Sequence, residues 1–116
     1  MQRILVIDDD ENIRSILSML LRKIGYDVEV AEDGEKGIAL LDEMGDFDLV
    51  VIDIRMPNMD GNEVARYIRN SGKSGAPLIA ITGDSDEVQP ETFDYSLIKP
   101  FTLEDFGLMV RSFDLI

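Results

Sequence analysis

The chain has 116 residues, a length that fits one domain, and its 45% hydrophobic and 30% charged residues are ordinary for a folded globular protein. It contains no cysteine and no histidine, which excludes disulfides, thiolate metal sites and the general base most used near neutral pH. A net charge of −13 without a basic stripe argues against direct binding to nucleic acid, and no apolar run approaches the roughly 18 residues of a membrane span.

The first half of the chain alternates buried strands with amphipathic helices. Residues 3–7 form a continuous apolar run, which is typical of a parallel strand buried on both faces. Apolar residues then recur at helical spacing over 13–24, and a weaker strand is expected at 28–31. A second helix over 35–44 and a second buried strand over 48–53 follow.

The same alternation continues after the third strand. Asp60 and Glu63 have the spacing of a capping box, which predicts that a helix begins there. Residues 71–76 are rich in glycine and serine and predict a loop. Another buried strand is expected over 77–82.

The segment 83–95 contains few apolar residues and carries Pro90, so it has room for a turn or two of helix at most. A short strand at 96–98 and a last helix opened by Thr102 complete the chain. Alternation of this kind predicts a parallel sheet with helices on both faces. In such sheets ligands bind beyond the carboxyl ends of the strands, so the residues that end the strands matter most.

Polar side chains end four of the five expected strands. They are Asp8, Asp9 and Asp10 after the first strand, Asp53 at the end of the third, Thr82 at the end of the fourth and Lys99 after the fifth. Converging carboxylates repel one another unless a cation lies among them, and oxygen ligands favour Mg²⁺ or Mn²⁺ over zinc. A lysine and a threonine beside such a metal suit a phosphoryl group. For Asp10 alone, capping of the next helix is the simpler interpretation.

Four segments of the chain, residues 4–10, 48–61, 81–83 and 99–101, resemble the receiver domain of two-component response regulators, in particular the chemotaxis-regulator-like members. The resemblance covers essentially the whole chain, so residues 1–116 are expected to form one receiver domain without an output domain. It implies a flavodoxin-like, doubly wound five-stranded parallel sheet with strand order 2-1-3-4-5.

The resemblance also implies a role for each of the marked residues. Asp53 is expected to be the phosphoacceptor, Thr82 to hydrogen-bond the phosphoryl group and Lys99 to pair with one of its oxygens. The expected Mg²⁺ ligands are Asp9, Asp53, the backbone carbonyl of Arg55 and, through water, Asp8. The Lys99–Pro100 peptide bond is expected to be cis.

By the same resemblance the phosphoryl donor is a phosphohistidine on a sensor histidine kinase or a phosphotransfer protein. The phosphorylated form then binds a protein target, which the sequence does not identify. The chain would catalyse only its own phosphorylation and dephosphorylation and would be no conventional enzyme. Because a strand-like segment begins at the N-terminus with no signal peptide before it, we expect a cytoplasmic protein.

Residues next to the expected site are candidates for tuning it. Gly83 has no side chain and leaves room for a phosphoryl group or an attacking water. Arg55 and Asp84 lie two positions beyond Asp53 and Thr82, and we hypothesise that they pair across the entrance and alter the lifetime of the phosphorylated state.

The chain departs from the family pattern in two places. Receivers usually carry an aromatic residue three positions before the lysine, where this chain has Ser96, and Tyr95 would point to the opposite face of the strand. Only 16 residues separate Thr82 from Lys99, which is fewer than usual. The fourth helix is therefore expected to be shortened or absent. We expect the chain to signal through another face, such as the first helix, or through ordering of the 83–95 segment.

Two other functions compete with this one. A phosphatase of the haloacid dehalogenase type could use Asp8 as nucleophile and Asp10 as acid, but Asn12 does not match its pattern and the chain has no cap domain. The second alternative is a receiver-like module that binds proteins without phosphorylation. Such modules usually lose an acidic residue, the acceptor or the lysine, and this chain keeps them all.

Overall fold

The computed structural model describes residues 2–72 and 75–113. The elements follow the order β1 (Arg3–Ile7), α1 (Glu11–Ile24), β2 (Asp27–Ala31), α2 (Gly34–Met44), β3 (Leu49–Asp53), α3 (Gly61–Ser71), β4 (Leu78–Thr82), η1 (Ser85–Glu87), β5 (Tyr95–Ile98) and α4 (Leu103–Ser112). The strands form one five-stranded sheet in the order β2-β1-β3-β4-β5, and every pair of neighbours is parallel. The predicted fold class and strand order are therefore confirmed.

The element boundaries differ from the sequence-based ones by one or two residues. β2 and β5 each begin one residue earlier than expected, α1 begins two residues earlier, at Glu11, and α3 extends through Ser71. Lys73 and Ser74 of the expected 71–76 loop lie outside the described residues. Differences of this size are usual at frayed element ends.

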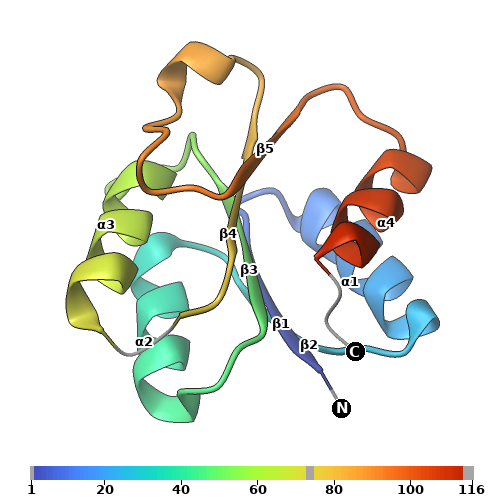
Figure 1. Ribbon diagram of the computed structural model, residues 1–116, viewed down its shortest axis with the longest axis horizontal. Coiled ribbons are helices and arrows are strands. Elements are labelled where there is room, and N and C mark those ends of the chain that lie inside the picture. Colours follow the sequence, from blue (N-terminus) through green and yellow to red (C-terminus); the bar gives the residue numbers. More distant parts are fainter. Residues whose placement is uncertain (1, 73–74, 114–116) are drawn as a thin grey trace.

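The sheet is covered on both faces. Figure 1 shows α1 and α4 on one side of the strands and α2 and α3 on the other. Side chains alternate along β1, so Ile4 and Val6 belong to the core under α1 and α4, and Leu5 and Ile7 belong to the core under α2 and α3. All four are fully buried, and burial of one such side chain contributes about 1.5–3 kcal/mol.

Polar side chains cap the N-termini of all four α-helices in the described part of the chain. They are Asp10 for α1, Asp33 for α2, Asp60 for α3 and Thr102 for α4. The capping box predicted at Asp60 is present, with Glu63 as its second member, and so is the expected cap at Asp10, which accepts from two backbone N–H groups of α1. Each cap contributes roughly 1 kcal/mol and fixes where the preceding loop must end.

The 83–95 segment contains a single turn of 3₁₀-helix, η1, where the family pattern has a longer helix. The expectation of a shortened fourth helix is confirmed. The segment passes over α3, as Figure 1 shows in orange, and inserts Val88 and Phe93 into the core under α2 and α3. These two buried side chains anchor a segment that has little regular structure.

Candidate functional site

Strand register brings the predicted residues to one edge of the sheet. Ile7 of β1 pairs with Ile52 of β3, so the residues that follow them, Asp8 and Asp53, leave the sheet side by side. Thr82 of β4 pairs with Ile98 of β5, which places Lys99 immediately beyond Thr82. The pairing of parallel strands therefore brings the residues at and just beyond these strand ends together.

Three carboxylates and one ammonium group form the centre of this site. One oxygen each from Asp8, Asp9 and Asp53 lies within 4.8 Å of the other two. The Nζ atom of Lys99 lies 3.6 Å from Oδ1 of Asp53. Asp53 is only 4% exposed, so its carboxylate faces the cluster rather than open solvent.

Gly61 explains how α3 approaches Asp53 so closely. A Cβ atom at this position would lie 2.4 Å from the carbonyl oxygen of Asp53 and 2.9 Å from the Cα atom of Ile54. Only glycine permits that approach, and the Gly61 N–H donates to the carbonyl oxygen of Ile54 at 2.9 Å. The first turn of α3 thereby supports the backbone at the end of β3.

Asp8 is the most buried member of the cluster, and one of its oxygens lacks a partner. Its Oδ1 atom accepts from the backbone N–H of Asp10 at 2.9 Å, and its carbonyl oxygen accepts from the Arg14 guanidinium at 2.7 Å. Its buried Oδ2 atom has no hydrogen-bond partner in the described part of the chain. An unsatisfied buried oxygen costs about 1–3 kcal/mol, and a bound cation would remove that cost.

The electrostatics of the cluster also favour a cation. Burial, reinforced by the charge of Asp8, raises the pKa of Asp53 to about 7, although Lys99 acts in the opposite direction. Burial likewise raises the pKa of Asp8. Carboxylates that resist ionisation in this way are stabilised by a nearby positive charge, and their oxygens are hard ligands. The residues present therefore fit Mg²⁺ or Mn²⁺.

Thr82 is buried beside the cluster, but its hydroxyl group is engaged elsewhere. Its Oγ1 atom donates to the carbonyl oxygen of Asp84 at 3.0 Å and accepts from the Asp84 N–H at 3.1 Å. At Gly83, a Cβ atom would have no heavy atom within 4 Å, so the space expected there is open. The hydroxyl group can reach a new acceptor only by releasing Asp84.

Arg55 pairs with Glu87, so the hypothesis that Arg55 pairs with Asp84 is wrong. The Nε atom of Arg55 lies 2.9 Å and 3.0 Å from the two carboxylate oxygens of Glu87, and Nη2 donates to the same group. Asp84 instead caps η1 by accepting from the Asp86 N–H at 2.9 Å. The hydrogen bond lowers the pKa of Glu87 and raises that of Arg55. No pattern in the sequence marked Glu87.

The region around β5 contains the remaining residues singled out by the sequence. The ring of Tyr95 packs edge-on against Phe113, with centroids 6.5 Å apart. Ser96 points to the other face and borders a hollow of about 420 Å³ that is also lined by Val88 and Phe93. The Lys99–Pro100 peptide bond is cis, as expected.

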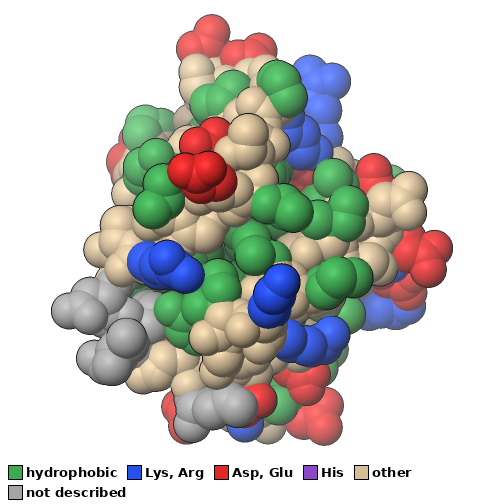
Figure 2. All heavy atoms as spheres, turned by 90° about the vertical axis from the view of Figure 1, so that its right-hand side faces the viewer, with side chains coloured by type: hydrophobic (Ala, Val, Ile, Leu, Met, Phe, Trp, Pro, Cys, Tyr) green, Lys and Arg blue, Asp and Glu red, His purple; other side chains and the backbone are tan. Residues whose placement is uncertain are grey.

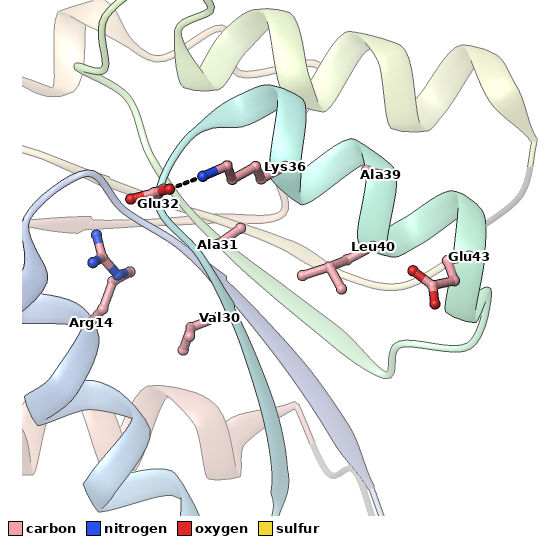
Figure 3. A pocket seen from close by; sticks show the side chains of 8 residues that line it. All are labelled: Arg14, Val30, Ala31, Glu32, Lys36, Ala39, Leu40 and Glu43. Carbon is pink, nitrogen blue, oxygen red and sulfur yellow. Dashed lines mark hydrogen bonds and ion pairs between the residues drawn. The ribbon is translucent and has the colours of Figure 1, made fainter.

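A second hollow, of about 450 Å³, lies between α1, β2 and α2. In Figure 3 its floor is formed by Val30, Ala31 and Leu40, and the ion pair between Glu32 and Lys36 crosses one end. The carboxylate cluster does not line it. This hollow is therefore separate from the chemical site.

Sequence comparison connects the site to a known family. The model of the response regulator receiver domain matches residues 4–111. The transcriptional regulatory protein TrcR of Mycobacterium tuberculosis is 38% identical over 119 residues, which cover 95% of this chain and 46% of TrcR. The chain thus spans about half the length of this curated relative.

Solved structures agree with the family match. Response regulator protein TrrA of Thermotoga maritima, in complex with Mg(2+)-BeF, is 35% identical with a TM-score of 0.87, covering 97% of this chain and 99% of that one. TrrA in complex with the histidine kinase ThkA gives 34% identity and a TM-score of 0.85, covering 97% and 98%. The chemotaxis response regulator CheY4 of Vibrio cholerae is 28% identical with a TM-score of 0.90, covering 97% and 98%.

The carboxylate cluster at the sheet edge, the match over residues 4–111 and the agreement with these folds lead to one conclusion. The chain belongs to the receiver domain family of response regulators, which are two-component signalling modules and not conventional enzymes.

Proposed function

We propose that Asp53 accepts a phosphoryl group in a Mg²⁺-dependent reaction and that the phosphorylated chain binds a different partner from the unphosphorylated one. The observation that carries this proposal is the position of Asp53, buried at a strand end with Lys99 3.6 Å away and two further carboxylates within 4.8 Å. A nucleophile, a fixed cation and a set of metal ligands thus converge on one small site.

In the proposed reaction a carboxylate oxygen of Asp53 attacks the phosphorus atom of the donor. The new P–O bond forms as the P–N bond of a phosphohistidine breaks, and the leaving imidazole takes the electron pair. A carboxylate needs no general base to act as nucleophile, which is consistent with a chain that has no histidine. The product is an acyl phosphate, which water hydrolyses to restore Asp53.

The metal would be held by Asp9, Asp53 and the backbone carbonyl of Arg55, with Asp8 contributing through water. When bound, Mg²⁺ offsets negative charge on the phosphoryl oxygens. The buried Oδ2 atom of Asp8, which has no hydrogen-bond partner among the described residues, supports this assignment.

Lys99 and Thr82 would hold the transferred group. The Lys99 ammonium already faces Asp53 and can pair with a phosphoryl oxygen as it arrives. Thr82 can donate its hydroxyl hydrogen to a second oxygen once it releases the Asp84 carbonyl. Lys99 would orient the phosphoryl group, and Thr82 would couple its binding to a change in the segment that follows β4.

The proposed donor is a phosphohistidine on a sensor kinase or phosphotransfer protein, and the complex of TrrA with ThkA supports that choice. A docking surface is available over α1 and α4. Ile16 and Met19 of α1 and Leu108 of α4 are exposed there, and Figure 2 shows hydrophobic side chains gathered on this face with Lys and Arg side chains among them.

No helix within residues 2–72 and 75–113 is long and apolar enough to cross a membrane.

Intact mass spectrometry after incubation with acetyl phosphate and Mg²⁺ tests the proposal directly. We expect one phosphate on the wild type, none on Asp53→Asn, and an unchanged adduct on the exposed control Asp46→Asn. EDTA is expected to abolish the adduct, and hydroxylamine to remove it, because acyl phosphates react with that nucleophile. If neither acetyl phosphate nor a phosphohistidine donor labels the wild type, the chain is a phosphorylation-independent binding module instead.

A further inference from the structure

We propose that two groups compete with a phosphoryl group on Asp53: the Glu87 carboxylate for the Arg55 guanidinium, and the Asp84 carbonyl oxygen for the Thr82 hydroxyl. Glu87, the residue that holds Arg55, would then determine how strongly the phosphorylated state is favoured. This inference rests on the function proposed for Asp53 and adds a positioning residue that acts on the acceptor site through Arg55.

The first competition concerns the hydroxyl group of Thr82. It has a single hydrogen, which it donates to the carbonyl oxygen of Asp84 at 3.0 Å. It cannot donate to Asp84 and to a phosphoryl oxygen at the same time. A phosphoryl group that recruits Thr82 therefore releases the start of the turn that leads into η1.

The second competition concerns the guanidinium group of Arg55. Arg55 lies two residues after Asp53 and is 81% exposed, yet Glu87 binds it through both Nε and Nη2. Guanidinium groups bind carboxylates and phosphates with the same forked geometry. A dianionic phosphoryl group on Asp53, two residues before Arg55, would compete with Glu87 for this fork.

Asn62 holds the backbone at Glu87 through hydrogen bonds that neither competition breaks. Asn62 of α3 is 8% exposed and binds the segment with both ends of its amide. Its Nδ2 atom donates to the carbonyl oxygen of Glu87 at 2.7 Å, and its Oδ1 atom accepts from the Gln89 N–H at 3.0 Å. The expected movement is therefore confined to the backbone of residues 83–86 and the side chain of Glu87, with Asn62 as the fixed point.

Reciprocity gives the direction of each effect. If a phosphoryl group must displace Glu87 from Arg55, then removing the Glu87 charge favours the phosphorylated state. Removing Arg55 takes away a group that the phosphoryl oxygens would recruit and disfavours that state. A residue that only stabilised the fold would not produce effects of opposite sign at the two ends of one ion pair.

Beryllium fluoride with Mg²⁺ gives an equilibrium test, because the complex on a carboxylate stands in for the phosphoryl group. Its apparent Kd can be measured by ¹⁵N NMR titration of Glu87→Gln, Arg55→Ala, the double variant and the control Asp86→Asn. Asp86 neighbours Glu87 and carries the same charge, but it has no side-chain partner among the described residues. The control therefore reports the effect of charge alone.

We expect Glu87→Gln to tighten binding and Arg55→Ala to weaken it, each by about two- to five-fold, the range typical of an exposed ion pair. Asp86→Asn is expected to bind like the wild type, and the double variant like Arg55→Ala. On addition of the complex, amide signals of residues 85–87 are expected to shift while the side-chain amide signals of Asn62 stay in place.

Two results would overturn the inference while leaving the proposed function intact. One is an equal effect of Glu87→Gln and Asp86→Asn, and the other is an effect of Glu87→Gln that persists when Arg55 is alanine. A wild type that binds no beryllium fluoride and takes up no phosphate with Mg²⁺ present would instead overturn the function proposed for Asp53.

Discussion

Lys99 Nζ and Asp53 Oδ1 lie 3.6 Å apart, at the ends of two strands that are separated in the sheet by β4. The lysine therefore occupies part of the space around the carboxylate that a metal ion and a phosphoryl group would share. Its effects on the two ligands have opposite signs, because it repels a cation and attracts an anion.

Lys99→Ala is expected to bind Mg²⁺ more tightly than the wild type and to be phosphorylated more slowly. Loss of one preorganised positive contact to the transferring group costs roughly 100-fold in rate. Isothermal titration with Mg²⁺ and a mass-spectrometric time course with acetyl phosphate measure the two effects. Lys23→Ala, in the last turn of α1, is the control. Weaker Mg²⁺ binding by Lys99→Ala would contradict this account of the site.

Mg²⁺ is expected to raise the melting temperature of the wild type, because it binds the folded cluster and not the unfolded chain. At 100 times its Kd the stabilisation is about 2.7 kcal/mol. Asp8→Asn is expected to lose this response, whereas Asp10→Asn keeps it, since asparagine also caps helices well and Asp10 lies outside the three-carboxylate cluster. Circular dichroism melts with Mg²⁺ or EDTA measure it. Equal responses in the two variants would contradict the assignment of Asp8.

Asp53→Asn is expected to stabilise the metal-free protein in a pH-dependent way. The pKa of Asp53 is raised from 3.8 to about 7 in the folded state, so the wild type loses stability as the pH rises through that interval. Asparagine cannot ionise, so the variant escapes this loss. Melts in EDTA are expected to show a small difference between the two proteins at pH 4 and a larger one at pH 8.

Saturating Mg²⁺ is expected to reduce the difference at pH 8, because the cation offsets the charge that the buried carboxylate carries. The exposed control Asp46→Asn is expected to have a melting temperature close to that of the wild type at each pH. A difference between Asp53→Asn and the wild type that stays constant from pH 4 to pH 8 would mean that burial of the charge does not cost stability.

Asn62→Ala is expected to destabilise the protein by about 1–3 kcal/mol, because it leaves a carbonyl group and an N–H group of the 87–89 stretch without their buried partner. Chemical denaturation followed by circular dichroism measures the change. Asn70→Ala, an exposed position on the same helix, is the matched control and is expected to be neutral or slightly stabilising. Equal stability of the two variants would show that the amide does not hold the segment.

The positions of Asp8, Asp53, Thr82 and Lys99 could be predicted because each stands where an apolar run turns polar. Parallel strands in register bring such positions to one edge of the sheet, so local patterns in the sequence were enough to place the cluster. The helix caps at Asp10 and Asp60 were predictable for a related reason, since capping depends on residues three positions apart or fewer.

The partner of Arg55 could not be predicted in this way. Glu87 reaches Arg55 because Asn62, 25 residues earlier in the sequence, fixes the backbone at Glu87. The segment around Glu87 has no apolar periodicity that would reveal its path. The expected Arg55–Asp84 pair was inferred from the positions of these residues along the chain. The observed Arg55–Glu87 pair depends on a contact between α3 and the 83–95 segment.

The polar face of α3 gives the 83–95 segment its shape. Asn62, Arg66 and Arg69 are spaced four and three residues apart, so they share one side of the helix, and they hold Glu87, Gln89 and Asp94 in turn. The path of the segment thus depends on side chains of a helix that precedes it in the chain. Residues 83–95 transplanted into another receiver would therefore lose these contacts unless Asn62, Arg66 and Arg69 were transferred with them.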